Sequence, residues 1–160
     1  MMKNKPDWKI KVATDKDDHI IAQHFYQLWL DNEIPAEQLQ DNLQEITVDF
    51  LNQARQDSSF KAWLVEIEGE VVASISCQLF KGLYPLVFKS EVRQYGYIWN
   101  VYVESNYRRQ GIATALMNEA TNYLKSISCT RIVLHASPSG KPVYENLGFI
   151  PNNEMRLDLL

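Results

Sequence analysis

The sequence predicts a mixed α/β fold in which helices pack against the faces of one sheet. Three observations support this: segments of alternating polarity rich in strand formers, segments with apolar residues at helical spacing, and their interleaving along the chain. The expected order is β-α-α-β-β-β-α-β-α-β. The chain has 160 residues, of which 46% are hydrophobic and 22% charged. This is the composition of an ordinary folded protein, so we expect one domain over residues 1–160 and no disordered or coiled-coil chain.

The first half of the chain predicts a strand, two helices and two further strands. In this order the segments are Trp8–Ala13, Asp17–Leu30, Pro35–Gln56, Phe60–Ile67 and Glu70–Phe80. The Glu68-Gly69 pair between the last two segments is typical of a tight turn, which predicts a β-hairpin.

The second half predicts alternating strands and helices. In order, the segments are Tyr95–Val103, Ile112–Ile127, Arg131–Ala136, Lys141–Leu147 and Met155–Leu160. Gly148 is expected to end the short helix that precedes the last strand, because a glycine adopts the left-handed conformation of a helix C-terminus at little cost. No internal repeat, low-complexity tract or linker interrupts this order.

Charge and cysteine content exclude several classes of protein. The net charge is −4, so the chain lacks the basic surface of a nucleic-acid-binding protein. Cys77 and Cys129 lie in apolar segments and form no metal-ligand spacing, so we expect two reduced thiols and no metal. The polar stretch Met1–Asp18 has no apolar core of a leader peptide, and no apolar run can span a bilayer. A cytoplasmic protein without a membrane partner is therefore expected.

The segment from Asn100 to Thr114 carries the clearest chemical signal. A strand is followed by a short polar turn with two arginines, Arg108 and Arg109, and Gly111 then begins an amphipathic helix. The first amides of a helix have no intrahelical acceptor and lie at the positive end of the helix dipole. Gly111 has no Cβ, so phosphate oxygens can approach the backbone. The segment predicts an anion site, although its spacing is neither that of a P-loop nor that of a dinucleotide fingerprint.

Two motifs in this region resemble those of the GCN5-related N-acetyltransferase (GNAT) superfamily. Arg108-Arg109-Gln110-Gly111-Ile112-Ala113 matches the Arg/Gln-x-x-Gly-x-Gly/Ala signature, and Ile98–Val103 before it is similar to the central strand of that family. About 30 residues later, Val143–Phe149 looks like the family's Tyr-x-x-Leu-Gly-Phe segment. The resemblance covers Tyr95–Phe149 well, and Trp8–Phe80 only through element order. It implies a central mixed, mostly antiparallel sheet flanked by helices.

The resemblance implies acetyl-CoA as co-substrate and assigns residues to it. The helix start would hold the pyrophosphate, with Arg108 or Arg109 nearby. The amides concerned are those of Gln110, Gly111, Ile112, Ala113 and Thr114. The central strand of the family diverges from the next strand and leaves backbone groups for the pantetheine arm, here those of Val101 and Val103, with Tyr102 between them.

The same resemblance places Tyr144 at the position of the general acid, which hydrogen-bonds or protonates the departing thiolate. The base stays open. Strand alternation predicts Ile98, Asn100, Tyr102 and Glu104 on one face. On that face Glu104 is a candidate base at the strand exit, and Asn100 can position a water but cannot take a proton. His135, near the end of the following strand, is a further candidate.

These observations predict an N-acetyltransferase that moves an acetyl group from acetyl-CoA to a primary amine in a ternary complex. The amine stays open among small molecules, antibiotics, amino acids, peptide N-termini and protein lysines. A homodimer follows from the resemblance only. Two alternatives stay open as well: an acyl-CoA-binding sensor without catalysis, and a protein-interaction module that binds no CoA.

Overall fold

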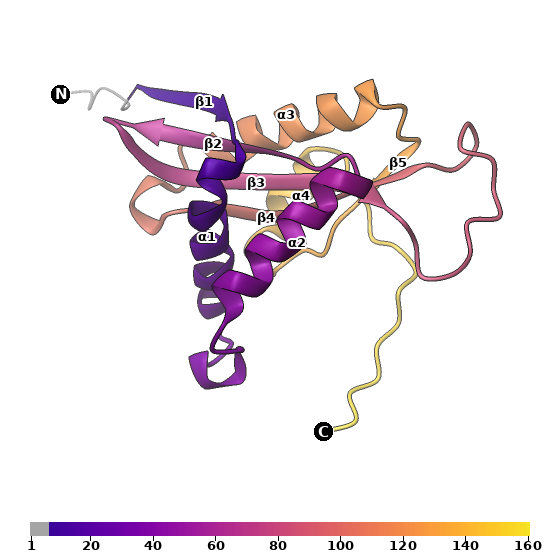
Figure 1. Cartoon of the computed structure of the whole chain (residues 1–160), viewed down its shortest axis with the longest axis horizontal. Helices are drawn as coiled ribbons and strands as arrows, with labels where there is room; N and C mark the ends of the chain where they lie inside the picture. The colour runs from indigo at the N-terminus through magenta and orange to yellow at the C-terminus, as the bar shows by residue number, and fades with distance from the viewer. Residues whose placement is uncertain (1–6) are drawn as a thin grey trace.

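A five-stranded sheet with the order β1-β2-β3-β4-β5 forms the centre of the computed structural model (Figure 1), which describes residues 7–160. Each of the first four strands is antiparallel to its neighbour, whereas β5 pairs parallel to β4. The strands are β1 (Trp8–Val12), β2 (Lys61–Ile67), β3 (Glu70–Phe80), β4 (Tyr95–Val103) and β5 (Arg131–Val133). Residues 1–6, the start of the stretch in which no leader peptide was expected, lie outside the described residues.

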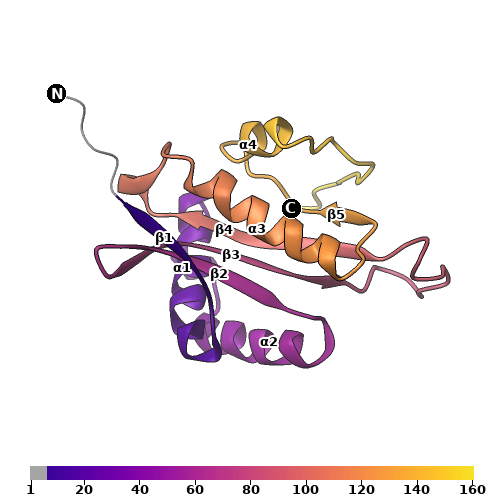
Figure 2. The same cartoon turned by 90° about the horizontal axis from the view of Figure 1, so that it is seen from above.

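Helices cover both faces of the sheet, as Figure 2 shows: α1 and α2 lie on one face, and α3 and α4 on the other. The helices are α1 (Asp18–Asp31), α2 (Leu43–Asp57), α3 (Ile112–Ser126) and α4 (Lys141–Asn146). Three short 3₁₀ turns, η1 (Asp15–Asp17), η2 (Ala36–Gln38) and η3 (Ser105–Tyr107), connect the larger elements. None of the helices within residues 7–160 is long and apolar enough to cross a membrane.

Two apolar clusters hold these layers together. The larger one joins α3 to the sheet through fully buried residues such as Leu116 and Leu124, which pack against Ile75 and Ile98. The smaller one lies on the opposite face, beneath α1 and α2. Its buried members are Ile21, Leu51, Ala62 and Leu64. Burial of one such Leu or Ile side chain contributes roughly 1.5–3 kcal/mol, so these faces supply the main force that positions the site.

The predicted mixed, mostly antiparallel sheet flanked by helices is confirmed, but two segments differ from the prediction. The single helix predicted over Pro35–Gln56 is divided, because Leu39 is extended (φ −90°, ψ 150°) between η2 and α2. Met155–Leu160, predicted as a strand, runs as irregular chain that projects from the body in Figure 1. A strand requires a neighbour for its N–H and C=O groups, and within residues 7–160 no strand pairs with this segment.

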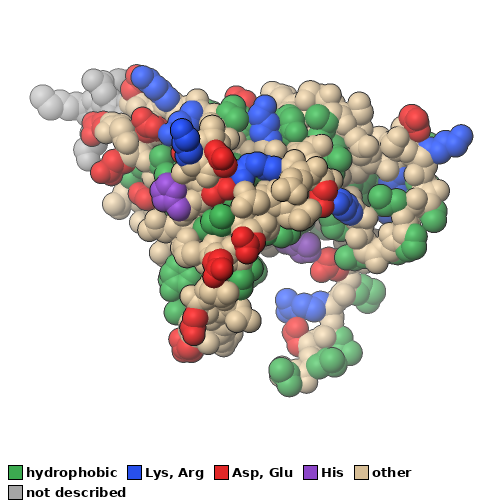
Figure 3. All heavy atoms as spheres, viewed as in Figure 1, with side chains coloured by type: hydrophobic (Ala, Val, Ile, Leu, Met, Phe, Trp, Pro, Cys, Tyr) green, Lys and Arg blue, Asp and Glu red, His purple; other side chains and the backbone are tan. Residues whose placement is uncertain are grey.

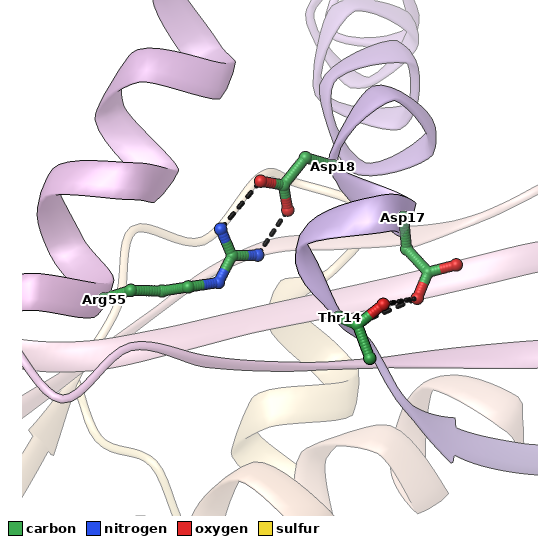
Figure 4. Close-up of polar contacts among 4 residues, drawn as sticks. All are labelled: Thr14, Asp17, Asp18 and Arg55. Atoms are coloured by element: carbon green, nitrogen blue, oxygen red, sulfur yellow. Dashed lines mark hydrogen bonds and ion pairs between the residues drawn. The ribbon is translucent and has the colours of Figure 1, made fainter.

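A buried ion pair fixes α1 against α2 (Figure 4). The Arg55 guanidinium on α2 donates to both carboxylate oxygens of Asp18 at the start of α1, with 2.7 Å from Nη1 to Oδ2. Asp18 is 4% exposed, so the Arg55 guanidinium takes the place of water as its hydrogen-bond partner. Just before it, Thr14 donates its backbone N–H to Asp17 Oδ2 at 2.8 Å and thereby fixes the entry into the helix.

We expect Arg55→Met to lower the free energy of unfolding by about 2–4 kcal/mol, because it leaves the buried Asp18 carboxylate without its partner. Urea denaturation followed by circular dichroism measures this. Lys81→Ala is the matched control, since Lys81 pairs with Asp57 at 3.1 Å between exposed side chains and should contribute about 0–1 kcal/mol. Equal effects of the two substitutions would contradict the structural role of the buried pair.

Candidate functional site

The sheet opens between β4 and β5. Their parallel ladder contains only the pairs Tyr95–Arg131, Gly96–Ile132 and Tyr97–Val133. Beyond Tyr97 no strand of residues 7–160 pairs with this edge of β4, so the two strands diverge into a fork. Backbone groups along the edge of β4 from Ile98 to Val103 therefore face the fork, where an extended ligand can take the place of a strand.

A β-bulge lies in β4 inside the fork. Trp99 pairs with Ser76 and Tyr102 with Ser74, so Asn100 and Val101 together oppose the single residue between those serines. The regular alternation predicted for this strand is therefore wrong. Ile98 packs on the α3 side of the sheet, whereas Asn100 and Tyr102 contact residues of α1 on the opposite side. The bulge moves Val101 to the α3 side.

Asn100 anchors the bulge. It has a left-handed backbone (φ 52°), a conformation that asparagine tolerates better than most residues. Its Nδ2 donates to Ser74 Oγ at 3.2 Å and to the carbonyl of Ile21 at 3.5 Å, which ties β4 to β3 and α1. Its Oδ1 is buried and has no hydrogen-bond partner. Asn100 thus holds the bulge of β4 in place beside the fork, and its side-chain nitrogen is occupied by these two hydrogen bonds.

His24 of α1 completes this buried polar cluster. Its Nδ1 lies 2.8 Å from Ser74 Oγ, and its ring centroid lies 4.7 Å from that of Tyr102. Burial lowers the pKa of His24 to about 4, so the ring is neutral at pH 7. A neutral, hydrogen-bonded histidine of this kind is a core residue, in agreement with the position of His24 on the apolar face of its helix.

The N-terminus of α3 lies directly after β4 and a polar turn. Gly111 has φ 85°, and a Cβ at this position would meet nothing within 4 Å. The first helical hydrogen bond runs from Ala115 N to Gly111 O at 3.1 Å. The amides of Ile112, Ala113 and Thr114 therefore have no intrahelical acceptor. The start of α3 thus combines amides without an intrahelical acceptor with open space at Gly111, and the anion site at this position stays a prediction.

The two predicted arginines differ in their surroundings. Arg108 donates through Nε to the carbonyl of Val103 at 2.7 Å and pairs with Asp31, the last residue of α1, at 2.6 Å. These contacts link the turn to α1 and draw the Arg108 side chain toward that helix. Arg109 has a left-handed backbone (φ 60°) and an exposed side chain. Arg109 is therefore the arginine whose charge is available to an anion at the start of α3.

Glu104 lies on the α1 side of the sheet. Its backbone N donates to the carbonyl of Val72 on β3 at 2.9 Å, and its side chain lines a small polar pocket with Gln23 and Gln27 of α1. Burial, and secondly the charge of Glu70, raise the pKa of the Glu104 carboxyl. Glu104 thus contacts α1 and β3, whereas the fork lies on the edge of β4 that faces β5.

Tyr144 lies on the side of the sheet that α3 covers. It belongs to α4, packs against the main apolar cluster, and its ring centroid lies 6.0 Å from that of Phe149. Burial raises the pKa of its hydroxyl, which keeps the phenol protonated and able to donate. Its Oη approaches Gly140 in the loop that leads from β5 into α4.

Three polar residues at the fork form a chain that only the fold reveals. Tyr97 Oη lies 2.7 Å from His135 Nδ1, and His135 Nε2 lies 3.2 Å from Glu154 Oε2. His135 was a candidate base from its sequence position, but neither Tyr97 nor Glu154 was singled out. These residues come from β4, the end of β5 and the C-terminal tail, so no local spacing in the sequence joins them.

Together these features define a class of α/β protein. Its sheet opens into a fork between β4 and β5, a bulge in β4 lies inside the fork, and the N-terminus of α3 follows β4 after a polar turn. The sequence profile of the acetyltransferase (GNAT) family matches residues 24–149. The chain therefore belongs to the GNAT acetyltransferase family.

Solved structures agree with this assignment. The chain is similar to a GCN5-related N-acetyltransferase from Ralstonia eutropha, with TM-score 0.80, 25% identity, and coverage of 96% of this chain and 99% of that one. It is equally similar to a predicted acetyltransferase from Clostridium acetobutylicum solved with acetyl-CoA, with TM-score 0.81, 26% identity, and coverage of 96% and 97%.

Two curated relatives match by sequence over shorter regions. A glucosamine 6-phosphate N-acetyltransferase from Trypanosoma brucei brucei is 37% identical over 68 residues, which is 42% of this chain and 46% of that protein. An N-alpha-acetyltransferase 30 from Xenopus laevis is 31% identical over 96 residues, 58% of this chain and 33% of the relative. The aligned region thus spans less than half of either relative.

We expect the buried His24 to make folding pH-dependent. Its pKa is about 4 in the folded chain and about 6.5 when exposed, so the unfolded state binds more protons in this interval. The free energy of unfolding should fall as the pH drops from 6.5 toward 4, by up to about 3 kcal/mol from this residue. Urea denaturation at several pH values measures this. His24→Gln should flatten that part of the profile, and an unchanged slope would contradict the assignment.

Proposed function

We propose that this chain transfers an acetyl group from acetyl-CoA to a primary amine by direct attack in a ternary complex. The observation that supports this most strongly is the juxtaposition of the β4–β5 fork with the N-terminus of α3. The two features suit a ligand with an extended polar arm and an anionic end. The family and the similarity to a structure solved with acetyl-CoA point to the same ligand.

In this proposal the start of α3 holds the pyrophosphate. The amides of Ile112, Ala113 and Thr114 have no intrahelical acceptor and lie at the positive end of the helix dipole. Gly111 and the preceding Gln110 continue this rim, and Arg109 adds positive charge. Arg108 acts indirectly, because its contacts with Val103 and Asp31 hold the turn in place.

The pantetheine arm then lies along the free edge of β4. Val101 and Val103, with Tyr102 between them, lie in the region where β5 has diverged, and the Val103 carbonyl also accepts from Arg108. Since the bulge at Asn100 and Val101 changes which groups face the fork, it can aim one amide at the thioester carbonyl. An amide in this position stabilises the negative charge that develops on the oxygen during attack.

The departing thiolate requires a proton or a hydrogen bond. Tyr144 suits this role because burial keeps its phenol protonated and it lies beside the loop after β5. A tyrosine ordinarily titrates near 10 and a thiol near 8.5, so transfer concerted with departure of the thiolate is favoured over complete transfer beforehand. The amine must also be neutral to attack, so this step requires a base.

We expect Gly111→Asp to weaken acetyl-CoA binding at least tenfold in isothermal titration calorimetry, because it places a negative charge where the pyrophosphate is proposed to lie. Gly69→Asp is a matched control: both glycines have φ 85° and neither has an atom within 4 Å of a built Cβ. Gly69 lies in the β2–β3 turn, outside the proposed pyrophosphate site, so this variant carries the same backbone strain without a charge at the start of α3.

Unchanged affinity in Gly111→Asp would refute the placement of the pyrophosphate. If the unmodified chain binds no acetyl-CoA at all, the proposed function itself is wrong and a protein-interaction module becomes the better explanation.

We expect Tyr144→Phe to lower kcat by about 100-fold while the Kd for acetyl-CoA stays within about twofold, since the hydroxyl acts on the leaving group. Release of free thiol in the presence of a panel of amines measures turnover. Tyr123→Phe is the control, because it removes the same hydroxyl group from the last turn of α3, where that hydroxyl donates to Ser59 O at 2.8 Å. Equal turnover in the two variants would exclude Tyr144 as the acid.

A further inference from the structure

Tyr97, His135 and Glu154 form a hydrogen-bonded chain at the fork. The hydroxyl of Tyr97 and both ring nitrogens of His135 are engaged, at 2.7 Å and 3.2 Å. Tyr97 is half-buried, whereas the His135 and Glu154 side chains are 70% and 72% exposed. One end of the chain therefore lies within the protein and the other reaches solvent.

The identity of the last member fixes the direction of these hydrogen bonds. An ionised carboxylate can only accept, so Glu154 requires the proton of His135 on Nε2. In the neutral imidazole Nδ1 is then an acceptor, and it takes the hydrogen bond that Tyr97 Oη–H donates. The chain is thus polarised from Tyr97 toward Glu154, which is the arrangement in which a proton can move outward.

The chain lies at the point where the sheet opens. Tyr97 and Val133 form the last pair of the β4–β5 ladder, and His135 follows two residues after that pair. The two residues at the apex of the fork thus come from β4 and from the segment directly after β5.

The chain also lies on the face opposite Tyr144. The ladder is regular from Tyr97 to Trp99, so these two side chains share a face. Trp99 packs at 5.2 Å from Phe25 of α1 and 5.5 Å from Phe50 of α2. Tyr97 therefore lies on the α1 and α2 side, whereas Tyr144 packs with the cluster on the α3 side. In the proposed reaction the amine needs a group that takes up its proton and the thiolate needs a hydrogen-bond donor, and the fork provides one polar group on each face of the sheet for these two steps.

Resting on the proposed function, we propose that Tyr97, His135 and Glu154 form the relay that deprotonates the acceptor amine. The ammonium group gives a proton to Tyr97 Oη while the Tyr97 proton passes to His135 Nδ1. His135 becomes an imidazolium that Glu154 pairs with through Nε2–H. The neutral amine attacks the thioester carbon, the C–S bond breaks, and the proton shed by the new amide nitrogen balances the one taken up by sulfur. The imidazolium then releases its proton to solvent.

The roles of the three residues differ. Tyr97 touches the amine and is the catalytic residue, His135 stores the proton, and Glu154 is a positioning residue that sets the tautomer. The charged and titratable groups that face His135 are Tyr97 from β4 and Glu154 from the tail. Glu104, a candidate base from the sequence, contacts residues of α1 and β3 instead. Asn100, considered from the sequence as a residue that positions a water, donates to Ser74 of β3.

The test compares Tyr97→Phe, His135→Gln and Glu154→Gln with the unmodified chain. The measurement is the pH dependence of kcat/KM for acetyl transfer. The acceptors are a simple alkylamine, an amino sugar and a peptide with a free N-terminus. We expect kcat/KM at pH 7 to fall about 100-fold in the first two variants and about tenfold in the third. In Glu154→Gln the acid limb of the profile should also move to lower pH, because the imidazolium loses its carboxylate partner. His19→Gln, on the exposed face of α1, is the control.

A second measurement does not depend on turnover. In ¹⁵N nuclear magnetic resonance of the imidazole groups, His135 should be the Nε2–H tautomer in the unmodified chain and a mixture of tautomers in Glu154→Gln. All variants should keep the affinity for acetyl-CoA, which calorimetry checks.

The outcomes separate the two proposals. Transfer by the unmodified chain with an unchanged pH profile in all three variants would overturn the relay and leave the proposed function intact. An Nδ1–H tautomer of His135 in the unmodified chain would overturn the relay as well. Absence of transfer by the unmodified chain to every amine of the panel would remove the proposed function and the relay with it.

Discussion

The early end of the ladder between β4 and β5 is the constraint on which the site depends. After three pairs the strands diverge, and the edge of β4 loses the neighbour that would satisfy its backbone groups. Backbone groups that are buried without a partner cost free energy, so other parts of the fold must compensate for them. A ligand that pairs with this edge would recover part of that free energy. In this chain the compensation comes from the two apolar clusters and from the Asn100 side chain, which ties the bulge to β3 and α1.

The same divergence separates two chemical environments. On the α3 side are the helix N-terminus and Tyr144, which suit the anionic end and the leaving group of a thioester. On the α1 and α2 side are Tyr97 and its partners, together with the aromatic residues around Trp99. Figure 3 shows further exposed apolar side chains on the β3–β4 loop and on the C-terminal tail. In the proposed mechanism, proton donation and proton removal therefore lie on opposite faces of one sheet.

Much of this fold could be predicted because its elements have strong local signals. The helix of Ile112–Ser126 and the strands Glu70–Phe80 and Tyr95–Val103 follow from apolar periodicity, which burial against a sheet requires. The bulge could not be predicted, since Asn100 adopts its left-handed backbone only because Ser74 and Ile21 hold its side chain. The strand predicted over Met155–Leu160 is absent although the segment alternates in polarity, because a strand forms only where the edge of a sheet is available to pair with it.

The sequence by itself predicted the helices that cover the sheet and the Arg108–Ala113 motif at the start of one of them, because helix periodicity and this motif are local properties of the chain. Only the tertiary structure decided the partners of the side chains. It directed Arg108 to Asp31 and Glu104 toward α1 and β3, and it joined Tyr97, His135 and Glu154 into one chain. Hydrogen bonds and ion pairs require approach within about 3 Å. For residues 19 to 77 positions apart, the packing of the sheet and helices sets that approach.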